Sequence, residues 1–412
     1  MMHTILYYII LTAIILYVLI CIYIKVKFKF WSIQPVFHVY DFLYWIYPIG
    51  LVQRELPEPN KYVNYVNISV ENADTISDVT MKRVCNFIQS FYLRKNTNVN
   101  YIPTHGSITD YFKCSNHPSY ISTYKNTINS VSTSSKNTGD SIYNLDELIG
   151  VFTARPLLIT LKGNSGFPLY YCDNLCIHPS YRKKGIAPKL IQTQYYKLRR
   201  LNKNINTFLF KREGELTAIV PLVAYHSIVY SSQDIIANNK NKKNHSINLL
   251  EITEKNVFLL TQLLTDCKII FDCIIVPELG TLVNLLKTNN IFIYGIISNN
   301  SLVACYVFKY QYLIYNENEH TIDCIASINA LKDNNGLFYS GFKLSLCSVI
   351  KKSLELNRPI KRFLIENTSH KHIIVDYLNA IIPSPYFKSP CAFFLYNYIS
   401  YTKQPSSCFI LY

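Results

Sequence analysis

The alternation of apolar and polar positions predicts a chain that begins with one long apolar segment and continues as a mixture of strands and helices. Residues 5–24 contain no charged side chain. Further along, a helix capped by Asp78 is predicted, because apolar residues recur at helical spacing from Val84 to Tyr92. Runs of apolar and β-branched residues predict strands at 61–71, 148–153, 157–161, 168–178 and 206–210, with a helix at 185–201.

The second half of the chain repeats this order. A polar, basic stretch at 231–246 ends the first series, and a segment rich in Ser, Thr and Asn at 115–140 predicts a loop. The later pattern predicts strands at 247–252, 291–297, 302–309, 321–328 and 361–366, with helices at 254–265 and 338–356. We therefore expect an α+β protein of two tandem units, residues 28–240 and 241–412, that share one central mixed sheet.

The apolar segment predicts a membrane anchor at residues 1–27. An apolar helix of this length crosses the roughly 30 Å of hydrocarbon in a bilayer. No small-residue cleavage site follows it, which argues against a removable signal peptide, and tyrosines near both ends favour interfacial positions over a buried core helix. Lys25, Lys27 and Lys29 follow directly, so the positive-inside rule places the remaining chain in the cytosol.

Composition and charge narrow the classes of function. The twelve cysteines form no CxxC pair and no set at zinc-ligand spacing, which argues against a disulfide scaffold or a metal site and indicates a reducing compartment. The net charge of +15 suits nucleic acid, an anionic membrane face or a phosphorylated small molecule. No nucleic-acid-binding motif accompanies it, so we expect no nucleic acid partner. Short basic clusters such as 197–200 predict solvated surface.

The most informative stretch is "YYCDNLCIHPSYRKKGIAPKLIQTQYYKLRR" at residues 170–200. An apolar strand runs into Arg182-x-x-Gly185-x-Ala187 and then directly into an amphipathic helix. Such a turn directs successive backbone N–H groups and a helix N-terminus at one point, which is suited to a pyrophosphate. Gly185 and Ala187 allow the phosphates to approach the backbone closely. The motif resembles the acyl-CoA signature of the acetyltransferase superfamily, which implies acyl-CoA binding.

Four separated segments resemble the N-myristoyltransferases, a family within the acyl-CoA N-acyltransferase (GNAT-like) superfamily. The segment "NLCIHPSYRKKGIAPKLI" is similar to the family's FLCVHKKLRSKRLAPVLI. In the same order along the chain, "KFWSIQPV", "DELIGVFTARPLLI" and "AFFLYNYISYTKQPSSCFILY" resemble the family's N-terminal element, a strand pair and the C-terminal end. The resemblance covers most of the chain, although identity between these segments is low. It implies two GNAT-like units, no prosthetic group, and myristoyl-CoA as co-substrate.

The resemblance also implies a role for particular residues. Phe30 and Trp31 would pack against the adenine end of CoA. The phosphates would be held by Arg182, Lys183 and Lys184 together with the backbone of Gly185, Ile186 and Ala187. At the oxyanion turn, Asp173 would contact substrate, and the backbone amides of Asn174 and Leu175 would stabilise the thioester oxygen. Tyr92 and Tyr101 would line the peptide groove.

The C-terminus is apolar to its last residue. Residues 408–412 predict a strand with no polar tail, although chain ends normally fray into water; an edge strand that ends at the surface is the alternative. In the family, the carboxylate of the last residue is the general base that deprotonates the N-terminal glycine amine. The resemblance assigns this role to Tyr412.

Departures from the family pattern leave other functions open. The family's acidic run after the position of Tyr92 is replaced by Leu93-Arg94-Lys95, which favours neutral or acidic peptides over basic ones. Lys211 lies where the family has a Thr-Ala-Gly turn. We expect a monomeric, membrane-anchored glycylpeptide N-acyltransferase. A catalytically inactive module that binds acyl-CoA or a lipidated peptide, and an enzyme with a short acyl donor, are the alternatives.

Overall fold

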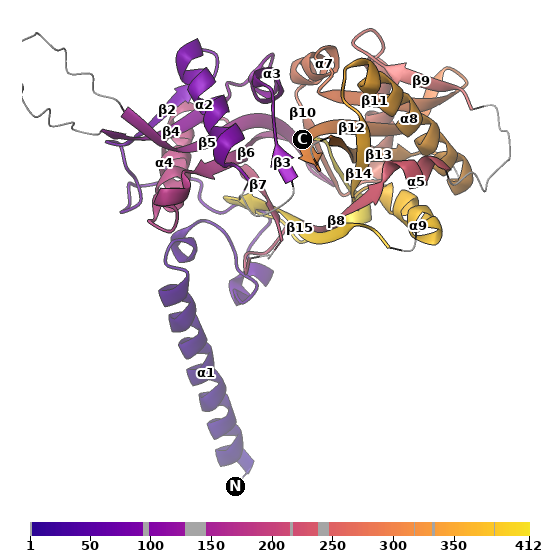
Figure 1. Ribbon diagram of the computed structural model, residues 1–412. Helices are drawn as coiled ribbons and strands as arrows, with labels where there is room; N and C mark the ends of the chain where they lie inside the picture. The colour runs from indigo at the N-terminus through magenta and orange to yellow at the C-terminus, as the bar shows by residue number, and fades with distance from the viewer. Residues whose placement is uncertain are drawn as a thin grey trace, which may run out of the picture.

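One large mixed sheet organises the protein (Figure 1). The computed structural model describes residues 2–93, 99–127, 146–214, 217–237, 247–316, 318–331, 334–382 and 384–412. Along the main path of the sheet, the strands follow in the order β17 (Cys408–Ile410), β10 (Cys273–Pro277), β5 (Asp146–Leu161), β6 (Phe167–Ile177), β7 (Phe208–Glu213), β15 (Phe387–Tyr396), β8 (Val223–Ser231), β14 (Ile360–Glu366), β13 (Glu319–Asn329), β12 (Ser301–Tyr315), β11 (Ile291–Ser298) and β9 (Leu249–Ile252). Outside this path, β4 (Tyr120–Thr127) pairs with β5 and β2 (Ile68–Asn72), and β3 (Val99–Tyr101) pairs with β12. A separate pair joins β1 (Gly50–Leu51) to β16 (Tyr398–Ile399).

Strands from the two halves of the chain interleave in this sheet. The late strand β15 lies between the early strands β7 and β8, and β10 with β17 extends the sheet beyond β5. The expected α+β class with a large mixed sheet is therefore confirmed. The division into two tandem units with a boundary near residue 240 stays a prediction, because the sheet crosses it without interruption.

Helices cover the sheet at both ends of the molecule. The helix α4 (Ile186–Leu201) packs on β2, β4, β5 and β6, while α2 (Asp78–Phe91) packs on β5 and β6. The long helix α8 (Asn335–Glu355) covers β9, β11, β12 and β14, and Phe338 and Phe342 on it are completely buried. The remaining helices are α3 (His105–Thr109), α5 (Ser232–Ala237), α6 (Phe258–Asp266), α7 (Leu279–Lys287) and α9 (Lys371–Ile381). Short 3-10 turns are η1 (Trp31–Ile33), η2 (Phe42–Trp45), η3 (Asp110–Phe112), η4 (Pro179–Tyr181), η5 (Cys267–Ile269) and η6 (Pro405–Ser407).

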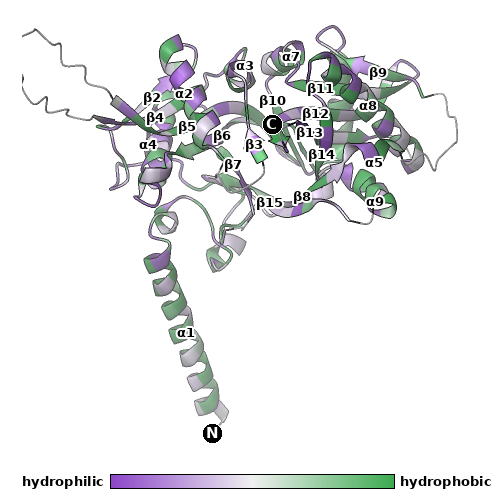
Figure 2. Cartoon of the chain, in the orientation of Figure 1, coloured by the Kyte–Doolittle hydropathy of each residue, from purple (hydrophilic) through white to green (hydrophobic). Residues whose placement is uncertain are grey.

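The N-terminal helix α1 (Met2–Lys27) projects away from the rest of the protein (Figure 1). Much of its ribbon has the green of hydrophobic residues in Figure 2. Residues 3–27 are long and apolar enough to cross a membrane, and none of the apolar window is buried against other parts of the protein. By length and composition, a signal sequence would pass the same test. The core-helix alternative does not fit this exposure.

Three local predictions were wrong, each for a physical reason. The predicted strand at 61–71 begins only at Ile68, because the Asn64 side chain accepts hydrogen bonds from the N–H groups of Val66 and Asn67 and so forms a turn. The helix predicted to be capped by Asp78 is capped by Ser77, which accepts from the Thr80 N–H at 3.2 Å. Within the loop predicted at 115–140, β4 occupies 120–127 and residues 128–140 lie outside the described part of the chain.

Candidate active site

A β-bulge in β6 provides the most distinctive backbone geometry of the site. Thr153 of β5 pairs with Asp173, and Val151 pairs with Cys176, so Asn174 and Leu175 face a single residue of β5. Asn174 has a left-handed backbone with φ of 52°, a conformation that Asn tolerates better than most residues. The two residues predicted to form an oxyanion hole are thus the two bulge residues.

The Asp173 side chain occupies part of this turn. Its Oδ1 accepts a hydrogen bond from the Asn174 backbone N–H at 2.7 Å, and the Thr153 hydroxyl donates to the Asp173 backbone carbonyl at 2.9 Å. The Asn174 side-chain amide donates to the same Thr153 hydroxyl at 3.2 Å. One of the two predicted oxyanion donors, the Asn174 N–H, is therefore paired with the Asp173 carboxylate. An acyl oxygen would have to displace this carboxylate before it could accept from the same N–H.

An apolar cavity of about 310 Å³ opens on one side of the bulge. Its walls come from η1, β5, β6, α4, β7 and β15, and they are mainly aromatic and aliphatic: Trp31, Phe152, Leu175, Ile191, Tyr195, Phe208, Phe210 and Tyr396. The Trp31 ring stacks on Phe210 at 5.8 Å between centroids, which fixes one wall. Such a cavity is suited to a flexible hydrocarbon chain, since each CH₂ removed from water contributes about 0.8 kcal/mol.

A charged cavity of about 410 Å³ lies on the other side of the bulge. Tyr92, Asp173, Asn174 and Lys211 line both cavities, so the two spaces meet at this turn. The charged cavity also contains Tyr101 and the C-terminal residue Tyr412. Its ionisable lining comes from both halves of the chain and comprises Arg155, Asp173, Lys211, Glu213, Lys309, Asp323 and Glu366.

The C-terminal residue is buried beside an ionic cluster. Leu411 and Tyr412 are 2% and 6% exposed, which excludes a frayed end. The Tyr412 hydroxyl donates to Glu366 Oε1 at 2.8 Å and accepts from Lys211 Nζ at 2.8 Å. Lys211 also pairs with Glu366 and with Glu213. Burial by itself lowers the pKa of Lys211, but Glu366 together with Tyr412, Tyr225 and Glu213 holds this pKa well above its usual value.

The turn from residue 182 to residue 187 forms a surface separate from both cavities. Lys183, Lys184 and Gly185 are exposed, and both Lys183 and Gly185 have positive φ, at 63° and 74°. Gly185 is the N-cap of α4, so the first N–H groups of that helix face the turn. The Arg182 guanidinium instead donates to the backbone carbonyls of Ile177 at 3.1 Å and Phe91 at 2.8 Å, which joins the end of β6 to α2.

The other predicted site residues line the charged cavity, the apolar cavity or neither of them. Tyr92 and Tyr101 lie with ring centroids 5.5 Å apart, and both line the charged cavity. Trp31 lines the apolar cavity, whereas Phe30 is buried against Tyr62 and lines neither cavity. Arg94 and Lys95, on which the expected change of peptide charge depended, lie outside the described residues. Arg155, Lys309 and Glu366 had no signal in the sequence, because strands far apart bring them together.

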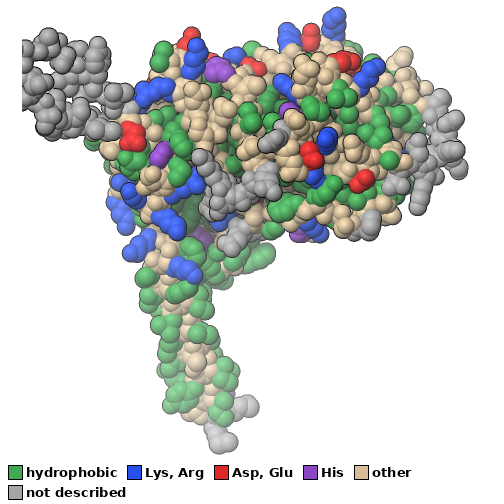
Figure 3. All heavy atoms as spheres, viewed as in Figure 1, with side chains coloured by type: hydrophobic (Ala, Val, Ile, Leu, Met, Phe, Trp, Pro, Cys, Tyr) green, Lys and Arg blue, Asp and Glu red, His purple; other side chains and the backbone are tan. Residues whose placement is uncertain are grey.

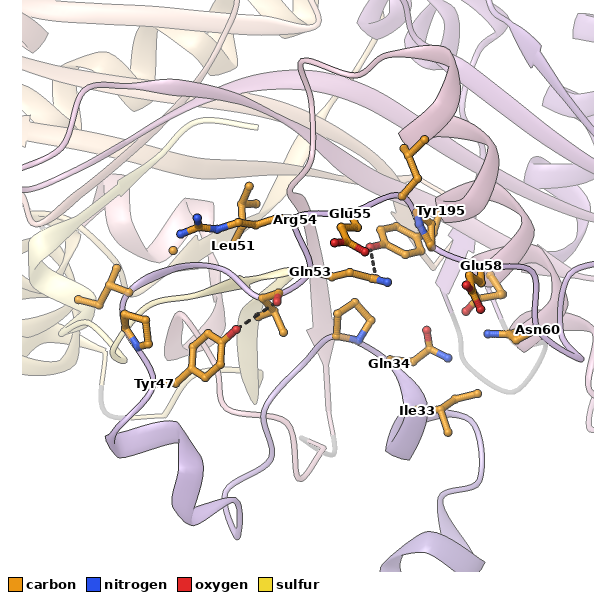
Figure 4. A pocket seen from close by; sticks show the side chains of 18 residues that line it. Ile33, Gln34, Tyr47, Leu51, Gln53, Arg54, Glu55, Glu58, Asn60 and Tyr195 are labelled. Atoms are coloured by element: carbon orange, nitrogen blue, oxygen red, sulfur yellow. Dashed lines mark hydrogen bonds between the residues drawn. The ribbon is translucent and has the colours of Figure 1, made fainter.

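Another cavity shares Tyr195 of α4 with the apolar cavity (Figure 4). It encloses about 720 Å³ between residues 47–60 and α4, and none of the predicted site residues lines it. The Tyr195 hydroxyl donates to Gln53 Oε1 at 3.1 Å across it. Arg199, predicted in a solvated cluster, is 1% exposed and donates to the carbonyls of Gln53, Arg54 and Glu55. These bonds hold the segment against α4, and we assign the cavity no chemistry.

Comparison with known proteins identifies solved structures that share this fold. No protein-family model and no curated protein sequence matches this chain. Solved structures do: the N-myristoyltransferase of Saccharomyces cerevisiae with bound myristoyl-CoA superposes with a TM-score of 0.66 at 16% identity, over 93% of this chain and 99% of that one. A second structure of the yeast enzyme with myristoyl-CoA gives 0.66 at 15% identity, over 92% and 90%. A third, with myristoyl-CoA and inhibitors, gives 0.65 at 16% identity, over 91% of each chain.

The chain has the N-myristoyltransferase fold. The resemblance found in four short segments is thereby confirmed at the level of the fold, over more than nine-tenths of the protein. Among the described residues, no group of three or more His, Cys, Asp or Glu side chains is placed to hold a metal ion. The yeast structures contain bound myristoyl-CoA.

Proposed function

We propose that this protein transfers a long-chain acyl group, myristoyl in the first place, from a CoA thioester to the N-terminal glycine amine of other proteins. One observation carries the proposal: an apolar cavity and a charged cavity meet at the β6 bulge, in a chain with the N-myristoyltransferase fold. The apolar cavity has the hydrophobic surface that an acyl chain needs. The charged cavity has the polar groups and aromatic walls that a peptide needs.

The bond changes require no covalent intermediate with the protein. The neutral amine attacks the thioester carbonyl, an amide bond forms, the C–S bond breaks and CoA leaves as its thiol. Negative charge develops on the acyl oxygen, and the Asn174 and Leu175 amides would stabilise it, each donor contributing roughly 3–4 kcal/mol in acyl-transfer enzymes. The exposed turn at 183–187 would hold the CoA phosphates, with Arg182 fixing the turn and Phe30 and Trp31 on the adenine side.

A base must remove a proton from the acceptor, because an N-terminal ammonium with a pKa of about 7.7–8.0 is largely protonated at neutral pH. We assign this role to the terminal carboxylate of Tyr412, the residue that ends the chain at the charged cavity. Tyr92, Tyr101 and Asp173 would position the peptide. The protein would act as a monomer held to the membrane by a single pass of α1, with the catalytic part in the cytosol beside its lipid-like donor.

The decisive experiment is an assay of the full chain in detergent micelles or nanodiscs with myristoyl-CoA and a Gly-initiated peptide. We expect release of free CoA thiol and a peptide that has gained one myristoyl group. Acetyl-CoA as a parallel donor tests the short-chain alternative, and an N-acetylated peptide is the matched negative control. Acyl-CoA binding without any product would refute the proposal.

A non-catalytic acyl-CoA binding module is the second candidate. It is favoured by the hydrogen bond from the Asn174 N–H to Asp173, which occupies one oxyanion donor with a negative group. Asp173→Asn separates the two candidates if the wild type binds acyl-CoA but does not turn over. Appearance of activity in that variant would show that the carboxylate suppresses catalysis, whereas its continued absence would favour a binding module.

A further inference from the structure

Two cations in the charged cavity form no ion pair with any residue that the structure describes. Arg155 on β5 is 4% exposed, and its Nη1 is a buried donor without a hydrogen-bond acceptor. Lys309 on β12 forms no ion pair or side-chain hydrogen bond with any described residue. Both instead lie over the Tyr111 ring, with Arg155 Cζ at 4.6 Å and Lys309 Nζ at 4.9 Å from its centroid. A buried cation without a counter-ion is costly, so this pair calls for an explanation.

The carboxylates nearby are already engaged. Glu366 and Glu213 pair with Lys211, and Asp173 accepts from the Asn174 N–H. Asp323 accepts from the Gln311 side-chain amide at 2.7 Å. Burial and the neighbouring Glu366 raise the pKa of Asp323 to about 8, so it carries little negative charge at neutral pH. Asp173 faces Lys309, but within the described part of the chain no side-chain carboxylate forms an ion pair with Arg155 or Lys309.

We propose that Arg155 and Lys309 form a subsite for an anionic side chain of the acceptor peptide, close to its N-terminal glycine. The inference rests on the proposed function and names its substrate class: Gly-initiated proteins with an acidic residue within the first few positions. Tyr111 forms a rigid wall beneath both cations, and Tyr171 flanks Arg155 at 4.9 Å. A guanidinium and an ammonium held in this way can bind one carboxylate or phosphate from two directions.

The test is a positional scan in the acyl-transfer assay. Gly-initiated peptides carry Glu, Gln or Lys at each of the positions that follow the glycine, and a phosphoserine peptide distinguishes carboxylate from phosphate as the preferred anion. We expect one or two positions at which Glu raises kcat/KM over Gln by about tenfold, and Lys lowers it. A Glu to Gln ratio near one at every position in the wild type would overturn the proposal.

Substitutions of Arg155 and Lys309 test whether these two cations cause the preference for Glu over Gln. Lys309→Met and Arg155→Met should each bring the Glu to Gln ratio close to one, whereas Arg155→Lys should retain part of it. Lys162→Met, the same change at an exposed lysine outside both cavities, should leave the ratio at the wild-type value. If the cations serve the terminal carboxylate of Tyr412 instead, both variants would slow all peptides alike and keep the ratio.

Two further measurements keep the result interpretable. The Tm of both methionine variants should not fall, because the change removes a buried charge without a partner. If the protein turns over no peptide, fluorescence anisotropy of labelled peptides with acyl-CoA-loaded protein tests the subsite alone. Tenfold tighter binding of the Glu peptide would then support the subsite while the transferase proposal fails, and equal binding would overturn the subsite.

A second, independent inference concerns the surface around η2. Val39, Phe42, Leu43, Trp45, Ile46 and Ile49 are all exposed, Trp45 at 71%, and together they form what we call the apolar patch. The patch is held rigidly, because the buried Tyr44 donates to the Ser400 carbonyl at 3.2 Å and Trp45 stacks on Tyr401. In Figure 3, hydrophobic side chains gather beside the end of α1 that leads into the body.

We infer that the apolar patch enters the interfacial region of the bilayer that α1 crosses. Lys25, Lys27 and Lys29 mark the level of the headgroups at that end of α1. Tryptophan with aliphatic neighbours at this level is typical of membrane-interface contacts. Such a second contact would fix the orientation of the cavities relative to the membrane.

Tryptophan fluorescence tests this contact, since the chain contains only Trp31 and Trp45. The full chain is reconstituted in nanodiscs with lipids brominated near the headgroup. Trp31→Phe, which retains Trp45, should be quenched severalfold more than Trp45→Phe, which retains Trp31. Equal quenching of the two variants in reconstituted protein would overturn the inference. Protein that stays soluble and does not enter nanodiscs would refute the anchor itself.

Discussion

The two cavities that meet at the β6 bulge differ in how their walls are built. The apolar cavity is lined largely by residues from the first half of the chain, with Tyr396 of β15 as the late contribution, and its surface follows from ordinary aromatic packing. The charged cavity takes Arg155 and Lys211 from the first half and Lys309, Asp323, Glu366 and Tyr412 from the second. The comparison indicates that the proposed donor site is a local property of the fold, whereas the proposed acceptor site depends on how the two halves come together.

Extending the chain by one or two residues beyond Tyr412 should have the largest effect. It would displace or mask the proposed base, and loss of a general base typically slows a reaction by about 10²–10⁴-fold. Myristoyl-CoA affinity, measured by calorimetry, should remain, because the apolar cavity is not touched. An extension of equal length at the N-terminus is the control, and full activity of the C-terminally extended protein would exclude the terminal carboxylate as base.

Lys211→Met should test whether the ionic cluster of the charged cavity supports the fold. The substitution leaves Glu366, whose side chain is 2% exposed, without its cation. Breaking a buried pair in this way costs about 3 kcal/mol or more, and we expect a clear loss in denaturant unfolding. The double variant Lys211→Met/Glu366→Gln should recover most of it. No recovery would mean that packing, and not the charge of Glu366, causes the loss.

Ile191→Phe should narrow the apolar cavity alone. Ile191 lies on α4 and lines that cavity but not the charged one. Excluding two or three CH₂ groups at about 0.8 kcal/mol each should shift preference towards shorter acyl chains by about tenfold. The measurement is kcat/KM for a series of acyl-CoA donors with a fixed peptide, and Leu344→Phe on exposed surface is a control for the added bulk. An unchanged chain-length profile would place the acyl group elsewhere.

The smallest expected effect is a pH dependence of peptide choice. Burial and the nearby Arg155 lower the pKa of Lys309 to about 8, with Asp173, Lys211 and Asp323 also facing it. Between pH 7 and pH 9 Lys309 loses its proton while Asp323, with a pKa of about 8, gains negative charge. The Glu to Gln preference should therefore fall severalfold, roughly as the charged fraction of Lys309 declines. The acceptor amine titrates in both peptides and cancels in the ratio, and Lys309→Arg should flatten most of the change.

Hydropathy and turn chemistry predicted the helices and strands whose own residues give a strong local signal. The strand, turn and helix at 168–201 were predicted to within a residue or two, because β6, Gly185 and the amphipathic α4 each have a strong local signal. The polar strand β4 was missed because Ser122 and Thr123 are buried: Ser122 donates to Gln194, and Thr123 is hydrogen-bonded to Ser69. Such polar residues can be buried because they find hydrogen-bond partners in other elements. These partners lie far away in the sequence, so a short stretch of sequence does not reveal them.

The sequence by itself determined the long apolar helix at the N-terminus, the strand, turn and helix at 168–201 and the buried character of the C-terminal strand, since each depends on residues that are adjacent in the chain. Only the tertiary structure decided that Arg182 donates to the Phe91 carbonyl and that Arg155 meets Lys309 over Tyr111. The reason is the interleaved sheet: hydrogen-bond pairing between distant strands sets which charges share a cavity, and charge interactions depend on distance in space and not on separation along the chain.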